Sequence, residues 1–306
     1  MIKKINVEVS SPERLDLYMS RVFDSVSRSK WQKLIKEGKI TVDGKMVPVK
    51  FHVEQGMTIE IGVDLDAKQE PITPPPLPEI LYEDADVLVL NKPAGLKVHA
   101  SNNNDRGPNL VHALLAARPE VASIGDKPDL RPGLVHRLDK DASGVLVVAK
   151  TQAAFEHLKA QFKERRVKKI YTVLIYGSLP KDHDLIEFEI QRGGEGRMAA
   201  HPKGSGKGRE AKTEYDVLQR FATTTLARVQ IHTGRTHQIR AHFFATQHPV
   251  VGDTLYTRKM KNIHPIPLNR LFLHAAELMI TLPSGEEKTF TASLPEELET
   301  VLESLS

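Results

Sequence analysis

The chain has 306 residues, with 43 lysines and arginines against 39 aspartates and glutamates, a formal net charge of +4. Hydrophobic residues make up 40% of it and charged residues 27%, a balance that excludes disordered and fibrous proteins. The absence of cysteine excludes disulfide scaffolds, thiolate zinc sites, iron–sulfur clusters and thiol nucleophiles. No stretch approaches the roughly 18 apolar residues of a membrane span, and the N-terminus lacks the apolar core of a secretory signal. We therefore expect a cytoplasmic protein without a membrane partner.

A proline-rich segment divides the sequence into two parts. Five of the eight residues from Pro71 to Pro78 are proline, which fixes the backbone angle φ and removes backbone hydrogen-bond donors. Such a segment forms an extended spacer outside any sheet or helix. We predict a small N-terminal module over residues 1–63, a linker over 64–79 and a larger domain over 80–306.

The N-terminal module has the pattern of two helices followed by a small hairpin sheet. Ser11 and Pro12 are typical of a helix start, and Leu15, Met19 and Val22 follow at helical spacing. The remaining elements are predicted as a helix over 29–37, a hairpin over 40–47 that turns at Asp43-Gly44, and a strand over 57–61.

Basic side chains are concentrated in this module, where nine lysines and arginines stand against four acidic residues between Arg14 and Lys50. On charge alone this could be a solvated helix face or a contact for nucleic-acid phosphates. Over about residues 12–62 the order resembles the S-four type of RNA-binding module, through Arg14-Leu15-Asp16, Ser27-Arg28-Ser29-Lys30, Lys33-Leu34-Ile35 and Val42-Asp43-Gly44-Lys45. The resemblance implies that Arg14, Arg28, Lys30 and Lys33 contact RNA.

The larger domain combines many strands with fewer helices. Apolar alternation predicts strands at 80–84, 87–90, 145–149, 169–176, 213–218, 224–231, 277–282 and 288–292. Helical spacing predicts helices at 109–117, 151–166 and 236–246 and from Pro295 onward. Because strands outnumber helices and hairpins join some of them, we expect an α+β fold with a mixed, largely antiparallel sheet flanked by helices, beside a small α/β module.

The segment from Arg131 to Gly144 places several ionisable side chains in a turn just before a buried strand, where a scaffold can hold reactive groups rigidly. Alone, Asp139 would fit a structural carboxylate that accepts turn amides. The pattern Asp139-x-Asp141-x-Ser143-Gly144 also imitates a calcium loop, but its twelfth position is Lys150 instead of glutamate. A calcium site is therefore not expected.

Two further patterns imitate cofactor sites. Gly206-Lys207 lacks the leading glycine and the following Ser or Thr of a phosphate loop, so we predict a flexible basic loop there. His237 and His242 are five residues apart rather than the four of a zinc-binding helix. We expect neither a metal nor a cofactor.

Six separated blocks, in order, resemble the RluA-type RNA pseudouridine synthases from about residue 80 to 294. They are Asn91-Lys92-Pro93-x-Gly95, His136-Arg137-Leu138-Asp139 with Ser143-Gly144, Lys169-Ile170-Tyr171, Gly234-Arg235-Thr236-His237-Gln238-Ile239-Arg240-x-His242, His248-Pro249-x-x-Gly252-Asp253-x-x-Tyr256, and Arg270-Leu271-Phe272-Leu273-His274-Ala275. Ala142 stands where this family usually has threonine, which removes a local hydrogen bond but no group with a role in proton transfer.

The resemblance implies isomerisation of uridine in RNA without a cofactor. The bond from ribose C1′ to uracil N1 breaks, the base rotates, and a bond to C5 forms. Asp139 would be the catalytic carboxylate, whether it attacks the sugar, attacks the base or abstracts a ribose proton. Arg240 would keep Asp139 ionised and oriented, and Tyr171 would stack on the base. Arg137 would enter the RNA stack as the uridine flips out, while His136 supports the loop.

Two more basic regions flank these residues. From Lys150 to Lys169, seven basic residues stand against two acidic ones, which predicts phosphate contacts beside Tyr171. The glycine-rich segment from Arg192 to Lys212 is expected to become ordered on RNA. The expected partner is large-subunit ribosomal RNA, free or within pre-ribosomal particles. Transfer RNA is an alternative substrate, and a non-catalytic ribosome assembly factor is an alternative function.

Overall fold

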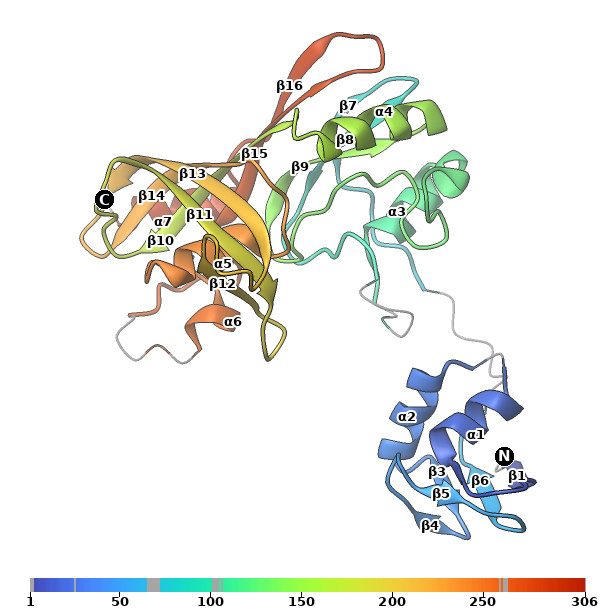
Figure 1. Cartoon of the computed structure of the whole chain (residues 1–306). Coiled ribbons are helices and arrows are strands. Elements are labelled where there is room, and N and C mark those ends of the chain that lie inside the picture. The colour runs from blue at the N-terminus through green and yellow to red at the C-terminus, as the bar shows by residue number, and fades with distance from the viewer. Residues whose placement is uncertain are drawn as a thin grey trace. The chain divides into compact units, whose positions relative to one another are not determined.

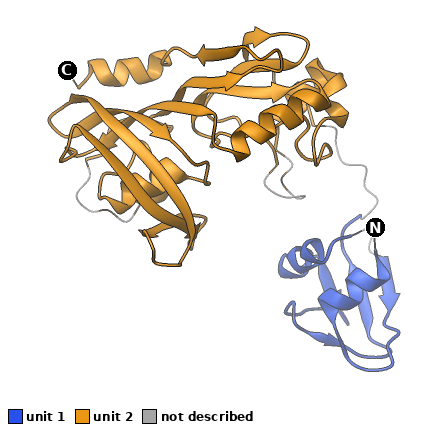
Figure 2. Cartoon of the chain, turned by 45° about the horizontal axis from the view of Figure 1, so that its top comes forward, with its two compact units in different colours: residues 1–71 blue, residues 72–306 orange. Residues whose placement is uncertain are grey.

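A computed structural model describes residues 3–24, 26–64, 72–100, 105, 107–258, 260 and 264–305. The chain forms two compact units, residues 1–71 and residues 72–306 (Figure 2). The division falls within the predicted linker, of which residues 65–71 lie outside the described part. Residues 72–78 form neither helix nor strand, and the first strand of unit 2 begins at Glu79.

Unit 1 is a small sheet covered by two helices (Figure 1). Its elements are β1 (Lys3–Asn6), β2 (Glu13–Arg14), α1 (Leu15–Val22), α2 (Arg28–Lys36), β3 (Ile40–Val42), β4 (Lys45–Met46), β5 (His52–Val53) and β6 (Thr58–Ile61). The strands pair in the order β1-β6-β3-β4, and β2 pairs separately with β5. The core consists of residues from both helices and the sheet, among them Leu15, Met19, Trp31, Ile35 and Ile59.

The predicted start of the first helix is wrong. Ser11 does not cap it, because Glu13 and Arg14 pair with β5 and the helix begins only at Leu15. The second helix begins one residue earlier than predicted, where the side chain of Ser27 accepts a hydrogen bond from the backbone N–H of Lys30. The hairpin at Asp43-Gly44 forms as predicted between β3 and β4.

Unit 2 is built on a ten-stranded mixed sheet. Its strands are β7 (Glu79–Glu83), β8 (Val87–Lys92), β9 (Ser143–Ala149), β10 (Lys168–Tyr176), β11 (His183–Arg192), β12 (Met198–Pro202), β13 (Arg209–Arg220), β14 (Thr224–Ile231), β15 (Leu273–Thr281) and β16 (Glu287–Thr291). The helices are α3 (Leu110–Ala117), α4 (Gln152–Lys163), α5 (Gln238–Ala245), α6 (Thr254–Thr257) and α7 (Glu296–Glu303), with a 3₁₀ turn at Pro119–Ser123.

The strand order is β12-β11-β13-β14-β10-β15-β9-β8-β7, and β16 pairs with the second half of β15. All these pairs are antiparallel except that of β15 with β9, which is parallel. The α+β prediction with a mixed, largely antiparallel sheet is therefore confirmed. Strands β9, β10 and β15, which carry or adjoin the predicted catalytic residues, lie side by side at the centre.

Both faces of the sheet are buried around β8 and β9, which explains why these strands are continuously apolar. Leu90 and Leu146 belong to the main core, together with residues of α3. Val89 and Val147 face the opposite side and pack with residues of α4, including Phe155. Figure 1 shows α4 running across β8 and β9.

The segment from Arg192 to Lys212 differs from the prediction of a loose loop. Strands β11 and β12 form a hairpin that packs on α5 and α6 through a small apolar cluster. The glycine-rich turn after β12 closes around the carboxylate of Glu189, which accepts from the backbone N–H of Gly204, Lys207 and Gly208 at 3.0, 2.9 and 3.3 Å and from the Ser205 hydroxyl at 2.9 Å. The turn has the donors of an anion-binding loop, but an internal carboxylate occupies them.

Within the described part of the chain, the helices are all too short or too polar to cross a bilayer.

Candidate active site

The turn that carries Asp139 is tight and anchored in the core. The backbone N–H of Ala142 donates to the carbonyl oxygen of Asp139 (3.3 Å), just before β9 begins. Leu138 and Ala142 are buried in the main core, whereas Asp139 retains partial exposure. The buried Leu138 and Ala142 therefore anchor a turn whose three charged residues, Asp139, Lys140 and Asp141, stay at the surface.

Lys92 anchors this turn through hydrogen bonds to backbone carbonyl oxygens. It is fully buried at the end of β8, and its ammonium group donates to the carbonyl oxygens of Pro93, Leu96 and Lys140 at 2.8, 2.8 and 3.0 Å. Burial lowers the pKa of Lys92 to about 7, but three carbonyl acceptors match the three donors of the charged form. The bond to Lys140 links the Asn91-Lys92-Pro93 block to the residue after Asp139.

Gly144, in β9, permits a close approach of β9 and β15. Gly144 has a φ of 113°, and a Cβ there would lie 2.2 Å from the carbonyl oxygen of Ala275. Gly144 and Ala275 are partners in the parallel pairing of β9 with β15. A side chain would separate these strands directly below the Asp139 turn.

Arg240 joins two aspartates in the interior of the site. Its Nε and Nη2 donate to the two carboxylate oxygens of Asp253 at 2.7 and 2.9 Å, and its Nη1 donates to Asp139 at 3.1 Å. The side chain of Asp253 is 1% exposed and that of Asp139 is 16% exposed. Burial alone would lower the pKa of Arg240, but hydrogen bonds and charges from Asp253 and Asp139 raise it. Asp253 thus holds the guanidinium rigidly, and one N–H remains for Asp139.

Sequence reasoning missed the role of Asp253, although it lies in a quoted block. Asp253 also caps α6, because its side chain accepts from the backbone N–H of Tyr256 (3.2 Å). The ring of Tyr256 lies 5.2 Å from the Arg240 guanidinium. Its hydroxyl exchanges hydrogen bonds with the backbone of Met198 on β12. The Gly-Asp-x-x-Tyr spacing is therefore explained by one short helix that supports Arg240.

Tyr171 enters the site from β10, where the pairing with β15 shifts register between Ile170 and Tyr171. Such bulges re-aim a side chain near functional sites. Tyr171 is 8% exposed. Burial, followed by the negative charge of Asp139, raises the pKa of Tyr171, so the hydroxyl stays protonated at neutral pH.

The segment between β14 and α5 is held by Gln238. The Gln238 side chain accepts from the hydroxyl of Thr233 (2.7 Å) and from the backbone N–H of Arg235 (3.0 Å). It donates to the carbonyl oxygen of Lys212 and the hydroxyl of Thr213 on β13. His237, at the start of α5, has a left-handed backbone with φ 52°, and its Nδ1 is buried without a hydrogen-bond partner among the described residues. Backbone strain of this kind is found at functional sites.

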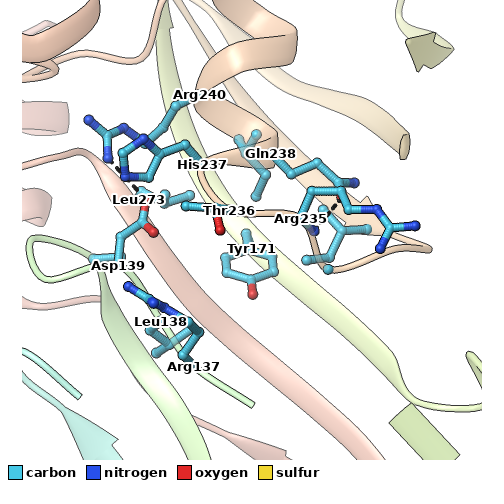
Figure 3. Close-up of a pocket in the computed structure, with 14 residues that line it drawn as sticks. Arg137, Leu138, Asp139, Tyr171, Arg235, Thr236, His237, Gln238, Arg240 and Leu273 are labelled. Carbon is cyan, nitrogen blue, oxygen red and sulfur yellow. Dashed lines mark hydrogen bonds and ion pairs between the residues drawn. The ribbon is translucent and has the colours of Figure 1, made fainter. Parts of the chain in front are cut away.

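These side chains line one pocket of about 580 Å³ that is open to solvent, the active-site pocket hereafter. Figure 3 shows Asp139 and Arg240 pointing toward one another, with His237 beside them and Tyr171 facing the same space. The lining is completed by apolar side chains that include Leu138, Ile231, Ile239 and Leu273. The structure therefore brings the three predicted catalytic residues together, and it adds His237 and Thr236, which were not assigned a role.

Two predicted residues of the same turn have different surroundings. Arg137 is exposed, lines the pocket and forms no ion pair with a described residue. The Nε2 of His136 accepts from the backbone N–H of Val147 (3.0 Å), and its ring stacks on Phe162 at 4.8 Å. Burial and the nearby charge of Lys169 lower the pKa of His136 to about 3. His136 is therefore neutral and anchored to β9.

A buried polar network under the turn was also missed. The hydroxyl of Ser143 accepts from Arg270 Nη2 at 2.6 Å and contacts His274 Nδ1 at 2.8 Å. His274 Nε2 contacts the carbonyl oxygen of Ala292 at 3.0 Å, and Arg270 pairs with Glu297 of α7. Since a carbonyl only accepts, neutral His274 carries its proton on Nε2 and Ser143 donates to Nδ1. The Ser143-Gly144 and Arg270-to-Ala275 blocks contained the only sequence signal for this network.

In unit 1, two of the predicted RNA-binding arginines share one buried carboxylate. Asp16 accepts from Arg14 at 3.1 Å twice, from Arg28 at 2.8 Å and from Gln32 at 2.6 Å. Burial alone would raise the pKa of Asp16, but these hydrogen bonds lower it to about 2. The side chains of Arg14 and Arg28 remain 31% and 45% exposed, so both guanidinium groups are fixed at the surface.

The two predicted lysines of α2 are less restrained. Lys33 is exposed and lies 3.7 Å from Glu37, and Lys30 is partly buried without an ion pair to a described residue. The other lysine predicted to bind RNA, Lys169, lies in unit 2 on β10, where its ammonium group is 5.9 Å from the ring of Phe162.

Among the residues the structure describes, no group of three His, Asp or Glu side chains is arranged to hold a metal ion.

Comparison with known proteins gives consistent matches over both units. The profile of the RNA pseudouridylate synthase family matches residues 86–245, and that of the S4 domain matches residues 13–59. An RNA pseudouridine synthase of Aquifex aeolicus is 42% identical over 82% of this chain and 79% of its own length. The ribosomal large subunit pseudouridine synthase D of Pseudomonas aeruginosa is 36% identical over 93% of this chain and 89% of its own.

A solved structure of the human RNA pseudouridylate synthase domain-containing protein 4 superposes with a TM-score of 0.58 at 25% identity. The match covers 74% of this chain and 92% of the human one.

Proposed function

Since the chain belongs to the RNA pseudouridine synthase family, we propose that it isomerises specific uridines of large-subunit ribosomal RNA and that Asp139 is the catalytic carboxylate. The observation that supports this assignment most is the 3.1 Å contact of Asp139 with Arg240 in a pocket that also contains Tyr171. An RNA-binding module of the S4 type precedes the catalytic unit.

The reaction moves one bond and changes no oxidation state. The bond between ribose C1′ and uracil N1 breaks, a bond between C1′ and C5 forms, and the C5 proton is transferred to N1 through solvent or a site group. Attack on the sugar, attack on the base and abstraction of a ribose proton all begin with an ionised carboxylate. Arg240 supplies its counter-charge and aims one oxygen, because Asp253 prevents the guanidinium from turning away.

Tyr171 and Arg137 have complementary roles in this proposal. The protonated Tyr171 ring, fixed on β10, stacks on the flipped uracil and limits its rotation. Flipping costs a few kcal/mol of stacking energy in a structured RNA. Arg137, exposed and without an ion pair to a described residue, inserts into the gap that the uridine leaves.

The substrate class rests on the relatives. Names of large-subunit synthases occur among proteins 32–36% identical to this chain over most of its length. In unit 1, the fixed pair Arg14 and Arg28 and the lysines Lys30 and Lys33 offer phosphate contacts. Transfer RNA is the second candidate substrate class, and a non-catalytic assembly factor is disfavoured because Asp139, Tyr171 and Arg240 are all present in one pocket.

The test uses purified protein with unmodified large-subunit ribosomal RNA and, separately, unmodified tRNA transcripts, each with a metal chelator, followed by chemical mapping of pseudouridine. We expect product at discrete uridines of the ribosomal RNA and none in tRNA. Product in tRNA alone would show that tRNA, and not large-subunit ribosomal RNA, is the substrate. Product in neither RNA, with RNA binding retained, would favour the assembly factor or a substrate that exists only in pre-ribosomal particles.

A further inference from the structure

A second pocket adjoins the active-site pocket and is lined by positive charge. It spans about 1280 Å³, part of which is open solvent, and it shares with the active-site pocket Arg137, Tyr171, Ile231, Gly234 and Arg235. We call it the basic pocket. A strand of RNA whose uridine occupies the active-site pocket can therefore continue into the basic pocket without leaving the surface.

The cations of the basic pocket come from different parts of the chain. Beyond Arg137 they are Arg131, Lys163, Arg165, Lys169, Arg209 and Arg235. Among the described residues that line it there is no aspartate or glutamate. They belong to the segment before the Asp139 turn, the end of α4, β10, the start of β13 and the segment before α5, so no single helix face explains the cluster.

These charges repel one another, and Glu210 offsets the repulsion on Arg235 only in part. Burial and the charge of Arg165 lower the pKa of Lys169 to about 8. Burial and the charges of Arg209 and Arg165 lower the pKa of Arg235. Several cations elsewhere in unit 2 have acidic partners, such as Lys159 with Asp126 at 2.7 Å and Lys150 with Glu83 at 2.7 Å. A bound anion would relieve the repulsion in the basic pocket.

Arg165 occupies a position that normally suits glycine. It follows α4 with a φ of 61°, in the left-handed region that closes many helices. A residue with a Cβ is less stable there than glycine. The chain thus has arginine, at a cost in backbone strain, at the rim of the basic pocket.

The space on the other side of Asp139 has a different character. That pocket is lined by three carboxylates as well as by cations: Asp139, Asp141 and Asp253 alternate there with Lys97, Arg137, Lys140, Arg240 and Arg270. The carboxylates offset part of its positive charge, whereas no aspartate or glutamate lines the basic pocket among the described residues. The two sides of the catalytic aspartate are therefore distinguishable by charge.

We propose that the basic pocket binds backbone phosphates of the RNA strand that leads away from the flipped uridine, so that the strand leaves the active site over Lys169, Arg165 and Arg209. This inference rests on the proposed function and specifies how its substrate lies. The chemical class of the ligand is a phosphodiester backbone, read without regard to base.

The experiment measures binding of a short synthetic RNA hairpin with a uridine-rich loop across a range of salt concentrations. The double variant Arg165→Gln, Arg209→Gln removes two charges of the basic pocket. The matched control Lys181→Gln, Arg220→Gln removes two charges of unit 2 that pair with Asp184 and Asp182. Each lost phosphate contact lowers the slope of log affinity against log salt by about 0.7 to 0.9, so the double variant should lose about 1.5 and the control nothing.

Equal slopes for the double variant, the control and the wild type would overturn the proposal. Arg165→Gly guards against misfolding, because it should raise the melting temperature while weakening RNA binding several-fold. Unchanged binding by that variant would also contradict the proposal. Pseudouridine formation by the wild type on ribosomal RNA is scored separately, so failure of the proposed function leaves the location of the RNA backbone to be decided by the slopes.

Discussion

The two aspartates bound to Arg240 should contribute very differently to stability. Asp253 is almost fully buried and binds the guanidinium through two hydrogen bonds, whereas Asp139 is more exposed and binds it through one. Removing one partner of a buried pair costs about 3 to 5 kcal/mol. The amide oxygen of Asp253→Asn can still accept one hydrogen bond and Asp139 remains as counter-ion, so we expect a loss of about 3 kcal/mol. Asp139→Asn leaves the stronger pair intact and should cost at most about 1 kcal/mol.

Urea unfolding can separate these values within the intact chain. The single tryptophan, Trp31, lies in the core of unit 1, so its fluorescence reports that unit and serves as an internal control. Far-UV circular dichroism follows the larger unit 2. Asp141→Asn, an exposed neighbour of the same turn, should change stability by less than about 0.5 kcal/mol. Equal losses for Asp139→Asn and Asp253→Asn, or a larger loss for Asp139→Asn, would refute the view that Asp253 is the main partner of Arg240.

Three other predictions concern single residues. The pKa of His136 is about 3 in the folded chain against 6.5 in the unfolded chain, so the unfolded chain binds more protons between these pH values. The free energy of unfolding should therefore fall as the pH drops from 6.5 to 3, by up to about 1.4 kcal/mol per pH unit. His136→Gln should flatten that dependence in urea titrations, and an unchanged slope would argue against a buried neutral imidazole. Lys169 has a pKa of about 8, so it loses its positive charge and RNA affinity should decline as the pH rises from 7 to 9. Lys169→Arg should abolish the decline. Identical pH profiles for the variant and the wild type would count against this. Gly144→Ala should cost more than about 2 kcal/mol of stability, because its Cβ would meet the carbonyl oxygen of Ala275. Gly285→Ala is the control, since no atom lies within 4 Å of the added Cβ and only the smaller backbone strain remains. Comparable melting temperatures of the two variants would disprove the close-approach argument.

Patterns of local origin were predictable from the sequence. The apolar runs of β8 and β9 reflect burial on both faces, and the helix α2 follows its apolar spacing. The start of α1 was not predictable, because the pairing of Glu13 and Arg14 with β5 depends on residues about forty positions away. The glycine-rich turn after β12 was misjudged for the same reason, since Glu189 fixes it from the neighbouring strand.

The residues of the candidate site were predictable from the family motifs in the sequence, whereas the side-chain contacts that hold them were not. The resemblance named Asp139, Tyr171 and Arg240, and the structure brings these side chains into one pocket. It did not indicate that Asp253 holds Arg240 or that Arg270 reaches Ser143, which are separated by 13 and 127 positions. Nothing in residue type or spacing specifies such long-range partners.

The central claim is that Asp139 performs chemistry rather than RNA binding, and single-turnover pseudouridine formation on unmodified large-subunit ribosomal RNA tests it most directly. Wild type, Asp139→Asn and the neighbouring control Asp141→Asn are compared at saturating protein, with RNA affinity measured in parallel. We expect no product from Asp139→Asn, RNA affinity within several-fold of wild type, and near-normal product from Asp141→Asn. Product formation by Asp139→Asn at a rate close to that of wild type would contradict the assignment of the catalytic carboxylate.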